Sequence, residues 1–93
     1  MKNKRLQNGF GQVSYTVIRD PMVTLSEKAL YSYLATYADK DSNETIVSIN
    51  RIASETNVSV STVKRNLDKL CELGIISRTR RGKNETWVTR LLK

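Results

Sequence analysis

The stretch SINRIASETNVSVSTVKRNLDKLCELG, residues 48–74, decides the fold of this chain. Ser48 and Ser59 each precede a segment with apolar residues at helical spacing, and a serine in that position caps a helix by accepting a hydrogen bond from an amide of the first turn. We therefore predict a short helix over residues 49–56 and a longer helix over residues 60–73. Their buried sides are expected to comprise Ile49, Ile52 and Ala53 in the first and Val60, Val63, Leu67, Leu70 and Cys71 in the second.

The junction between these two helices is short and suits a sharp change of direction. Asn57 tolerates the left-handed backbone conformation second only to glycine, so it can end the first helix. Ala53 is small enough to let the helices cross closely opposite Val63, whereas a larger side chain would force them apart. Gly74 is a typical end for the second helix. This spacing is that of a helix-turn-helix.

The flanking segments add a further helix and a hairpin. Upstream, Thr24 and Glu27 have the spacing of a capping box, with Ser26 as an alternative cap, and they open a helix near residues 25–38. Downstream, two segments are rich in strand-forming residues and are separated by turn residues, which predicts a hairpin. The two strands are expected at residues 75–80 and 85–92, with Arg81-Gly82-Lys83-Asn84 as the turn.

Two extended segments complete the prediction. Residues 12–19 are β-branched and roughly alternating, with Val13, Tyr15 and Val17 on one side, so they predict a short N-terminal strand. A brief extended piece is expected at residues 45–47. The fold class is therefore α+β, a winged helix-turn-helix of three helices with a C-terminal β-hairpin wing and a short N-terminal strand. This domain is expected to span residues 12–93, after a basic flexible tail over residues 1–11.

From Val17 to Ile76 the chain resembles the helix-turn-helix domain of replication proteins from plasmids and phages of Gram-positive bacteria. The matching residues are Val17-Ile18-Arg19-Asp20-Pro21, Leu25-Ser26, Leu30, Tyr33, Leu34, Tyr37, Ser48, Ile52-Ala53, Val58-Ser59, Thr62-Val63, Leu70 and Leu73-Gly74-Ile75-Ile76. Asn57 departs from the pattern, since the family more often has glycine there. The resemblance implies DNA binding at a plasmid or phage origin, in replication or conjugative transfer, or at an operator in transcription control. Other replication or transfer proteins would then be further partners.

The composition restricts the class of function. The 93 residues carry 16 Lys and Arg against 9 Asp and Glu, and this net charge of +7 favours a polyanionic partner such as nucleic acid. No apolar run reaches the length of a membrane span and no signal peptide is recognisable, so we expect a cytoplasmic protein without membrane contact. A single cysteine, Cys71, and the lack of histidine argue against a zinc site, an intrachain disulfide and any triad with a histidine base. We expect no cofactor, no metal and no enzymatic activity.

The longer helix carries the first set of candidate DNA-binding residues. With its apolar stripe turned inward, polar and basic residues face outward, and the free amides at its start favour an anion. Arg65 can make a bidentate contact to guanine, while Ser61 and Thr62 can reach bases or phosphates. The candidate residues of this helix are Ser59, Ser61, Thr62, Lys64, Arg65, Asn66 and Lys69. A merely solvated helix face is the alternative interpretation.

The predicted hairpin carries the second set. Residues 74–93 have a net charge of +5, and a basic hairpin predicts a wing over residues 78–85 that follows the DNA backbone or enters a minor groove. Its candidate residues are Arg78, Arg80, Arg81, Lys83 and Asn84. Ordinary solubilising charge is the alternative. Trp87 is expected to cover the core beside the first strand, with stacking on a base as the alternative. The tail residues Lys2, Lys4 and Arg5 could add a flexible phosphate contact, and an ordinary disordered basic start is the alternative.

Two classes of function follow from these observations. The first is a module that binds double-stranded DNA in a sequence-specific way, and the second is a winged helix that contacts an acidic protein. Binding to DNA should weaken steeply as the salt concentration rises, and unrelated duplex should compete only weakly with the specific site. Binding that duplex competitor does not affect would favour the protein-contact class. No long terminal helix offers a dimer interface, so we expect a monomer or a weak dimer that binds repeated sites side by side.

Overall fold

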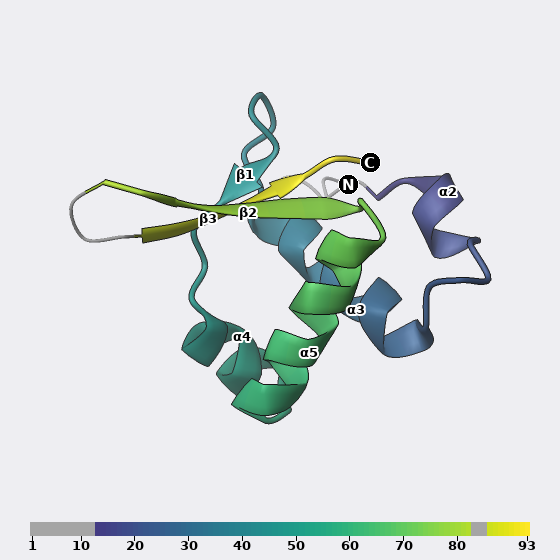
Figure 1. The fold of residues 1–93 in the computed structure, drawn as a ribbon, viewed down its shortest axis with the longest axis horizontal. Helices are drawn as coiled ribbons and strands as arrows, with labels where there is room; N and C mark the ends of the chain where they lie inside the picture. The colour runs from purple at the N-terminus through teal and green to yellow at the C-terminus, as the bar shows by residue number, and fades with distance from the viewer. Residues whose placement is uncertain (1–12, 83–85) are drawn as a thin grey trace, which may run out of the picture.

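The computed structural model describes residues 13–82 and 86–93, which form an α+β winged helix-turn-helix (Figure 1). Three antiparallel strands pair in the order β1-β3-β2, where β1 is Glu44–Thr45, β2 is Ile76–Arg81 and β3 is Thr86–Leu91. Helices α3, α4 and α5 lie on one side of this sheet, and the β2–β3 hairpin extends beyond them. The fold class predicted from the sequence is confirmed, apart from the N-terminal strand.

Helices α4 (Ile49–Thr56) and α5 (Val60–Glu72) form the helix-turn-helix, and their bounds agree with the prediction to within one residue. Both expected serine caps are present, because the Ser48 Oγ accepts a hydrogen bond from the Arg51 amide and the Ser59 Oγ accepts one from the Thr62 amide, each at 3.1 Å. Asn57 between the helices has φ +59° and ψ +41°, the left-handed conformation that the sharp turn requires.

Helix α3 (Leu25–Tyr37) begins with the predicted capping box. The Thr24 Oγ1 accepts a hydrogen bond from the Glu27 amide at 3.2 Å, and the Glu27 Oε1 accepts one from the Thr24 amide at 2.9 Å. Two otherwise unpaired amides are satisfied in this way. The capping box thereby closes the first turn of α3, which lies across a depression from α5.

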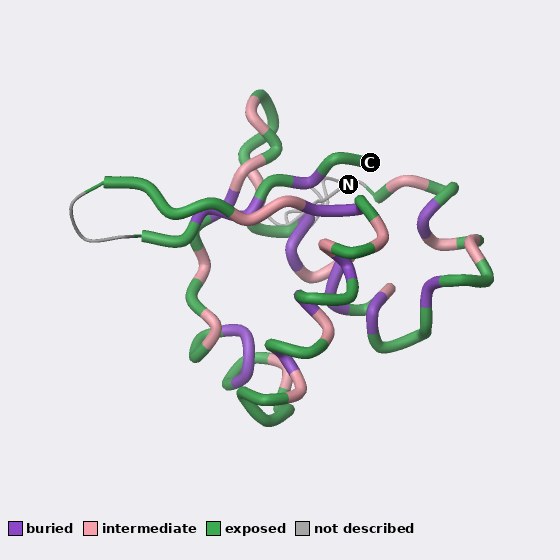
Figure 2. Tube along the Cα trace, viewed as in Figure 1, coloured by how far each residue is buried: buried purple, intermediate pink, exposed green. Residues whose placement is uncertain are grey.

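The core lies between the three helices and the base of the sheet (Figure 2). Helix α5 contributes three side chains that are almost completely buried, Val63, Leu67 and Leu70. Ala53 of α4 is 9 % exposed and belongs to the same core cluster as Val63, as the predicted close crossing requires. The other core residues are Val17, Val23, Leu30, Tyr31, Leu34, Ala35, Ile52, Ile75, Ile76 and Leu91.

One buried hydroxyl connects the beginning and the end of the described chain to α3. The Tyr31 hydroxyl accepts a hydrogen bond from the Ser14 amide at 2.9 Å and donates one to the Lys93 carbonyl at 3.0 Å. The Tyr31 side chain itself is 1 % exposed, so both contacts form at the border of the core. A single tyrosine thus anchors two segments that are far apart in sequence.

The hairpin follows directly after α5. Gly74 has φ +72° and Gly82 has φ +79°, so both glycines adopt a conformation that other residues rarely reach. Strands β2 and β3 pair in a register that places Ile76 opposite Leu91 and Arg80 opposite Trp87. Both strands lie within one residue of their predicted bounds, while the predicted turn residues Lys83 and Asn84 lie outside the described residues.

The strand predicted over residues 12–19 is wrong, because the described part of this segment contains the single-turn helix α2 (Tyr15–Ile18). Its backbone hydrogen bonds close locally, from the Ile18 amide to the Ser14 carbonyl and from the Arg19 amide to the Tyr15 carbonyl, so these groups are not available to a neighbouring strand. Val17 is buried but Tyr15 is 73 % exposed, so the alternating pattern does not mark one buried face.

Candidate nucleic-acid interface

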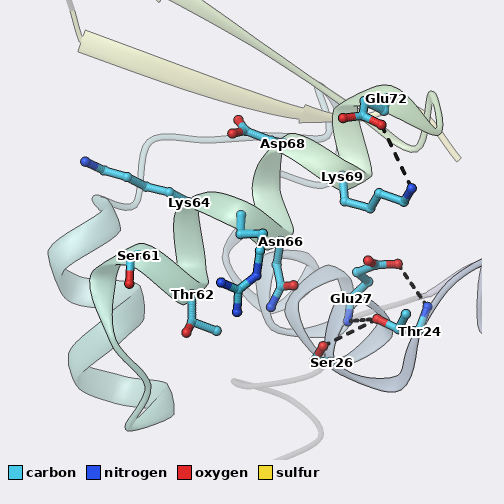
Figure 3. A pocket seen from close by; sticks show the side chains of 11 residues that line it. Thr24, Ser26, Glu27, Ser61, Thr62, Lys64, Asn66, Asp68, Lys69 and Glu72 are labelled. Atoms are coloured by element: carbon cyan, nitrogen blue, oxygen red, sulfur yellow. Dashed lines mark hydrogen bonds and ion pairs between the residues drawn. The ribbon is translucent and has the colours of Figure 1, made fainter.

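The outward face of α5 is exposed to solvent along its whole length. Because Val63, Leu67 and Leu70 turn into the core, the opposite side of the helix faces away from the protein. Figure 3 shows Ser61, Thr62 and Lys64 near the start of this face and Lys69 and Glu72 near its end. Ser61, Lys64, Arg65 and Lys69 are exposed, and Thr62 and Asn66 are half-buried. Val60, expected on the buried side, lies at the rim with 36 % exposure.

The two halves of this face differ in charge. Up to Arg65 it has no acidic residue, whereas Asp68 and Glu72 follow in the C-terminal half. The Lys69 Nζ lies 3.9 Å from the Glu72 Oε1, so part of its charge is already balanced. The sequence interpretation overlooked these two carboxylates, although their spacing of three and seven residues from Arg65 places all three on one side of a helix.

A shallow depression separates this face from the start of α3 (Figure 3). Arg65, Asn66 and Lys69 line it from α5, and Thr24, Ser26 and Glu27 line it from the other side. Thr24 and Glu27 are occupied by the capping box of α3, and Ser26 Oγ lies 3.4 Å from Thr24 Oγ1. The polar groups on the α3 side therefore stabilise their own helix, and the basic groups of the depression belong to α5.

Ser59 has a structural role that limits its value as a ligand contact. Besides capping the Thr62 amide, its hydroxyl donates to the Thr62 Oγ1 at 2.8 Å. The Thr62 amide, which was expected to be free for an anion, is therefore already bound to the Ser59 side chain.

The hairpin presents its arginines on two different sides. Side chains alternate along a strand, so Arg78, Arg80 and the cross-strand Trp87 share the side of the buried Ile76, which faces the helices. Arg81 lies on the other side and makes a two-pronged ion pair with Glu44 of β1, at 2.9 and 3.3 Å. The charged residues of the predicted wing therefore do not form a single surface.

Trp87 lies on the exposed part of the hairpin and not over the core. The expectation that it covers the core is wrong, because its side chain is 44 % exposed. The guanidinium carbons of Arg78 and Arg80 lie 4.8 and 5.2 Å from the centre of its ring, which is the geometry of cation–π stacking. Arg78 is further held by a hydrogen bond from its Nε to the Thr89 Oγ1 at 3.1 Å, and its partial burial lowers its pKa.

A polar cluster fixes α4 against α3. The hydroxyls of Tyr33 and Tyr37 both donate to the Glu55 Oε1 at 2.5 Å, and the Arg51 Nε donates to the Glu55 Oε2 at 3.1 Å. These hydrogen bonds, first from Tyr33 and Tyr37 and then from Arg51, lower the pKa of Glu55 from 4.5 to about 2. The only sign of this cluster in the sequence is weak, namely the spacing of four residues in both Tyr33/Tyr37 and Arg51/Glu55.

The described residues contain neither a metal-binding cluster nor a membrane-spanning helix. Within residues 13–82 and 86–93, no group of three or more His, Cys, Asp or Glu is placed to hold a metal ion. No helix in this part of the chain is both long and apolar enough to pass through a membrane. Cys71 is half-buried beside the core, and burial raises the pKa of its thiol.

Comparison with known proteins identifies the family of the domain. Neither the curated proteins nor the solved structures gave a match. A family described as helix-turn-helix domain matches residues 24–76, which is more than half of the chain and extends from the capping box of α3 to the start of β2. With the geometry of α4, Asn57 and α5, this match shows that the chain belongs to the helix-turn-helix domain family, a family of DNA-binding domains.

Proposed function

We propose that this protein binds double-stranded DNA in a sequence-specific way, with the N-terminal half of α5 in the major groove. The observation that carries this proposal is the face from Ser61 to Arg65, which is open to solvent, contains two cations and has no carboxylate. The side chains of Lys64 and Arg65 make no hydrogen bond or ion pair to another described residue, so they are available to a ligand. In helix-turn-helix proteins the N-terminal residues of this helix contact base edges.

The residues of α5 would divide the recognition between them. Arg65 is proposed to read guanine through a bidentate contact, with Ser61, Thr62 and Asn66 at neighbouring bases or phosphates. Lys64 and Lys69 would contact phosphates on either side, and Lys69 would contribute less because Glu72 balances it. Ser59 would act through its amide and through the helix start that it caps.

The hairpin would add contacts that do not depend on sequence. Arg78 and Arg80 lie on the side that faces the helices, so they are proposed to follow the DNA backbone or the minor groove next to α5. Arg81 would contribute less while it is paired with Glu44. For Lys83 and Asn84 the proposal rests on the sequence alone.

The biological setting of this binding is proposed from the resemblance to plasmid and phage replication proteins. It would be an origin of replication or conjugative transfer, or an operator, bound by a monomer or weak dimer on repeated sites. Footprinting on the plasmid or phage genome that encodes the protein would test this, because the three kinds of site differ in their position.

The DNA-reading role of Arg65 is tested by Arg65→Ala, with Arg19→Ala as a matched control. Arg19 follows α2, away from the hairpin tip, and stacks on the Tyr15 ring (Figure 1). We expect Arg65→Ala to cost about 1–3 kcal/mol on the footprinted site and to reduce the preference for it over unrelated duplex, while Arg19→Ala leaves both nearly unchanged. The measurement is anisotropy of labelled duplex at several salt concentrations.

Two results would contradict the proposal. An unchanged sequence preference in Arg65→Ala would refute the docking of α5 in the major groove. The second result is a complex with an acidic protein that neither unrelated nor footprinted duplex displaces. It would indicate a protein-binding role instead.

A further inference from the structure

A hollow of about 400 Å³ lies between the hairpin and the helix-turn-helix. Lys64 and Val60 line it from α5, Arg78 and Trp87 line it from the hairpin, and residues 46–50 line it from the start of α4 and the segment before it. Lys64 also lines the depression along the outward face of α5, so the hollow continues from the proposed DNA-reading surface.

The tryptophan in this hollow, Trp87, is held by its neighbours, but part of its ring and its N–H group make no contact that occupies them within the described residues. The two stacked arginines hold its ring in place. Its indole N–H donates no hydrogen bond to any described residue, although an indole N–H that packs in a protein interior usually has a partner. The exposed part of Trp87 therefore offers both a hydrogen-bond donor and an apolar surface to a ligand.

The chemistry of the hollow alternates between charged and apolar groups. Lys64 and Arg78 supply two cations from two different elements, while Val60 and Ile46 expose apolar surface beside them, at 36 % and 67 % exposure. A nucleic-acid backbone alternates in the same way between charged phosphates and largely apolar sugar rings. An acidic peptide would engage the cations but has no regular counterpart for the apolar surface.

We propose that this hollow binds one sugar-phosphate unit of the DNA backbone, with the phosphate between Lys64, Arg78 and the indole N–H of Trp87 and the deoxyribose against the exposed part of the indole. The inference rests on the proposed function, because it assumes that DNA runs along α5. It makes Trp87 a DNA contact and places the phosphate contact of Lys64 in this hollow.

The experiment uses the full chain and a short fluorescein-labelled duplex at low salt. Anisotropy of the label reports binding, and the emission of Trp87, the only tryptophan in the chain, reports occupation of the hollow. We expect Trp87 emission to change in parallel with anisotropy and its accessibility to acrylamide to fall on binding. Bound duplex that leaves both Trp87 signals unchanged would overturn the inference but not the proposed function, whereas no anisotropy change would contradict the proposed function itself.

Variants then test the individual contacts. Lys64→Ala should weaken duplex binding roughly three- to tenfold and reduce the salt slope by about one, because one phosphate contact is lost. Lys40→Ala removes the same charge from the loop before β1 and should change affinity by less than about twofold. Equal effects of the two substitutions would refute a specific contact by Lys64.

The role of the indole N–H is tested with Trp87→Phe, which keeps an aromatic ring for the two arginines to stack on and removes the donor. We expect a loss of duplex affinity of roughly tenfold with an unchanged circular dichroism spectrum, because one hydrogen bond to a charged group is removed. Wild-type affinity in Trp87→Phe would overturn the hydrogen bond. Titration with polyglutamate provides the last comparison, because a change in Trp87 emission as large as that caused by duplex would indicate a site for acidic polypeptides.

Discussion

Helix α5 and the β2–β3 hairpin are both basic, but they hold their cations in different ways. Lys64 and Arg65 of α5 extend into solvent without a hydrogen bond or ion pair to another described residue. Three arginines of the hairpin are engaged, Arg78 and Arg80 with the Trp87 ring and Arg81 with Glu44. Two basic side chains of the helix are therefore free of such contacts, whereas three arginines of the hairpin are held by neighbouring side chains.

This difference fits two kinds of recognition. Free side chains on a rigid helix can adjust to the donor and acceptor pattern of individual bases, which is what sequence reading requires. Side chains that are already held in place lose less conformational entropy on binding, and they suit a backbone whose geometry varies little with sequence. Within the proposed function, we infer that α5 supplies the specificity and that the hairpin adds affinity that does not depend on sequence.

The largest effect should come from disturbing the packing that keeps α5 rigid. Ala53→Leu adds bulk at the buried crossing of α4 and α5, so we expect it to lower the free energy of unfolding by about 1–3 kcal/mol and to reduce sequence-specific binding. Urea denaturation and duplex anisotropy measure the two effects. Ser54→Leu adds the same bulk on the exposed side of α4 and should change stability by less than about 0.5 kcal/mol. Equal stability of the two variants would show that the crossing does not depend on a small residue.

A smaller effect should follow from releasing a held cation of the hairpin. Glu44→Gln removes the ion-pair partner of Arg81, so we expect affinity for any duplex to rise roughly two- to fivefold and the salt slope to steepen by up to about one. Sequence preference should stay the same, because Arg81 is not on α5. Asp41→Asn removes the same charge from the neighbouring loop and serves as the control. A change in sequence preference in Glu44→Gln would contradict the division of roles.

The smallest effect at neutral pH concerns the cluster that fixes α4 on α3. Because the folded pKa of Glu55 is lowered from 4.5 to about 2, its contribution to stability is fully present above pH 4.5 and is lost as the pH falls towards 2. The stability difference between the wild type and Glu55→Gln should therefore shrink over this range. Urea denaturation at a series of pH values measures it. A difference that stays constant from pH 5 to about 2 would show that the carboxylate charge does not stabilise the cluster.

The helix-turn-helix was predictable because its signals are local. Ser48, Asn57, Ser59 and Gly74 each act on backbone groups within a few residues of themselves, so their meaning does not depend on the rest of the chain. The same holds for the capping box at Thr24. Wherever a cap or a turn residue defined an element, its bounds agree closely with the structure.

The predictions that were wrong depend on distant contacts. The segment around Tyr15 has a strand-like pattern, but its backbone pairs locally, and no sequence signal shows whether a strand edge would be available to it. The position of Trp87 depends on arginines of the opposite strand, and that of Arg81 on Glu44 of β1. Local patterns thus placed helix α5, while tertiary contacts decided which hairpin residues face it.

The double role of the Tyr31 hydroxyl has a consequence for how the domain opens. When this hydroxyl donates to the Lys93 carbonyl, its oxygen becomes a better acceptor for the Ser14 amide, so each hydrogen bond strengthens the other. Fraying of the last residue should therefore accelerate hydrogen exchange at Ser14, although the two lie at opposite ends of the described chain. Tyr31→Phe would remove both hydrogen bonds at once and uncouple the two segments.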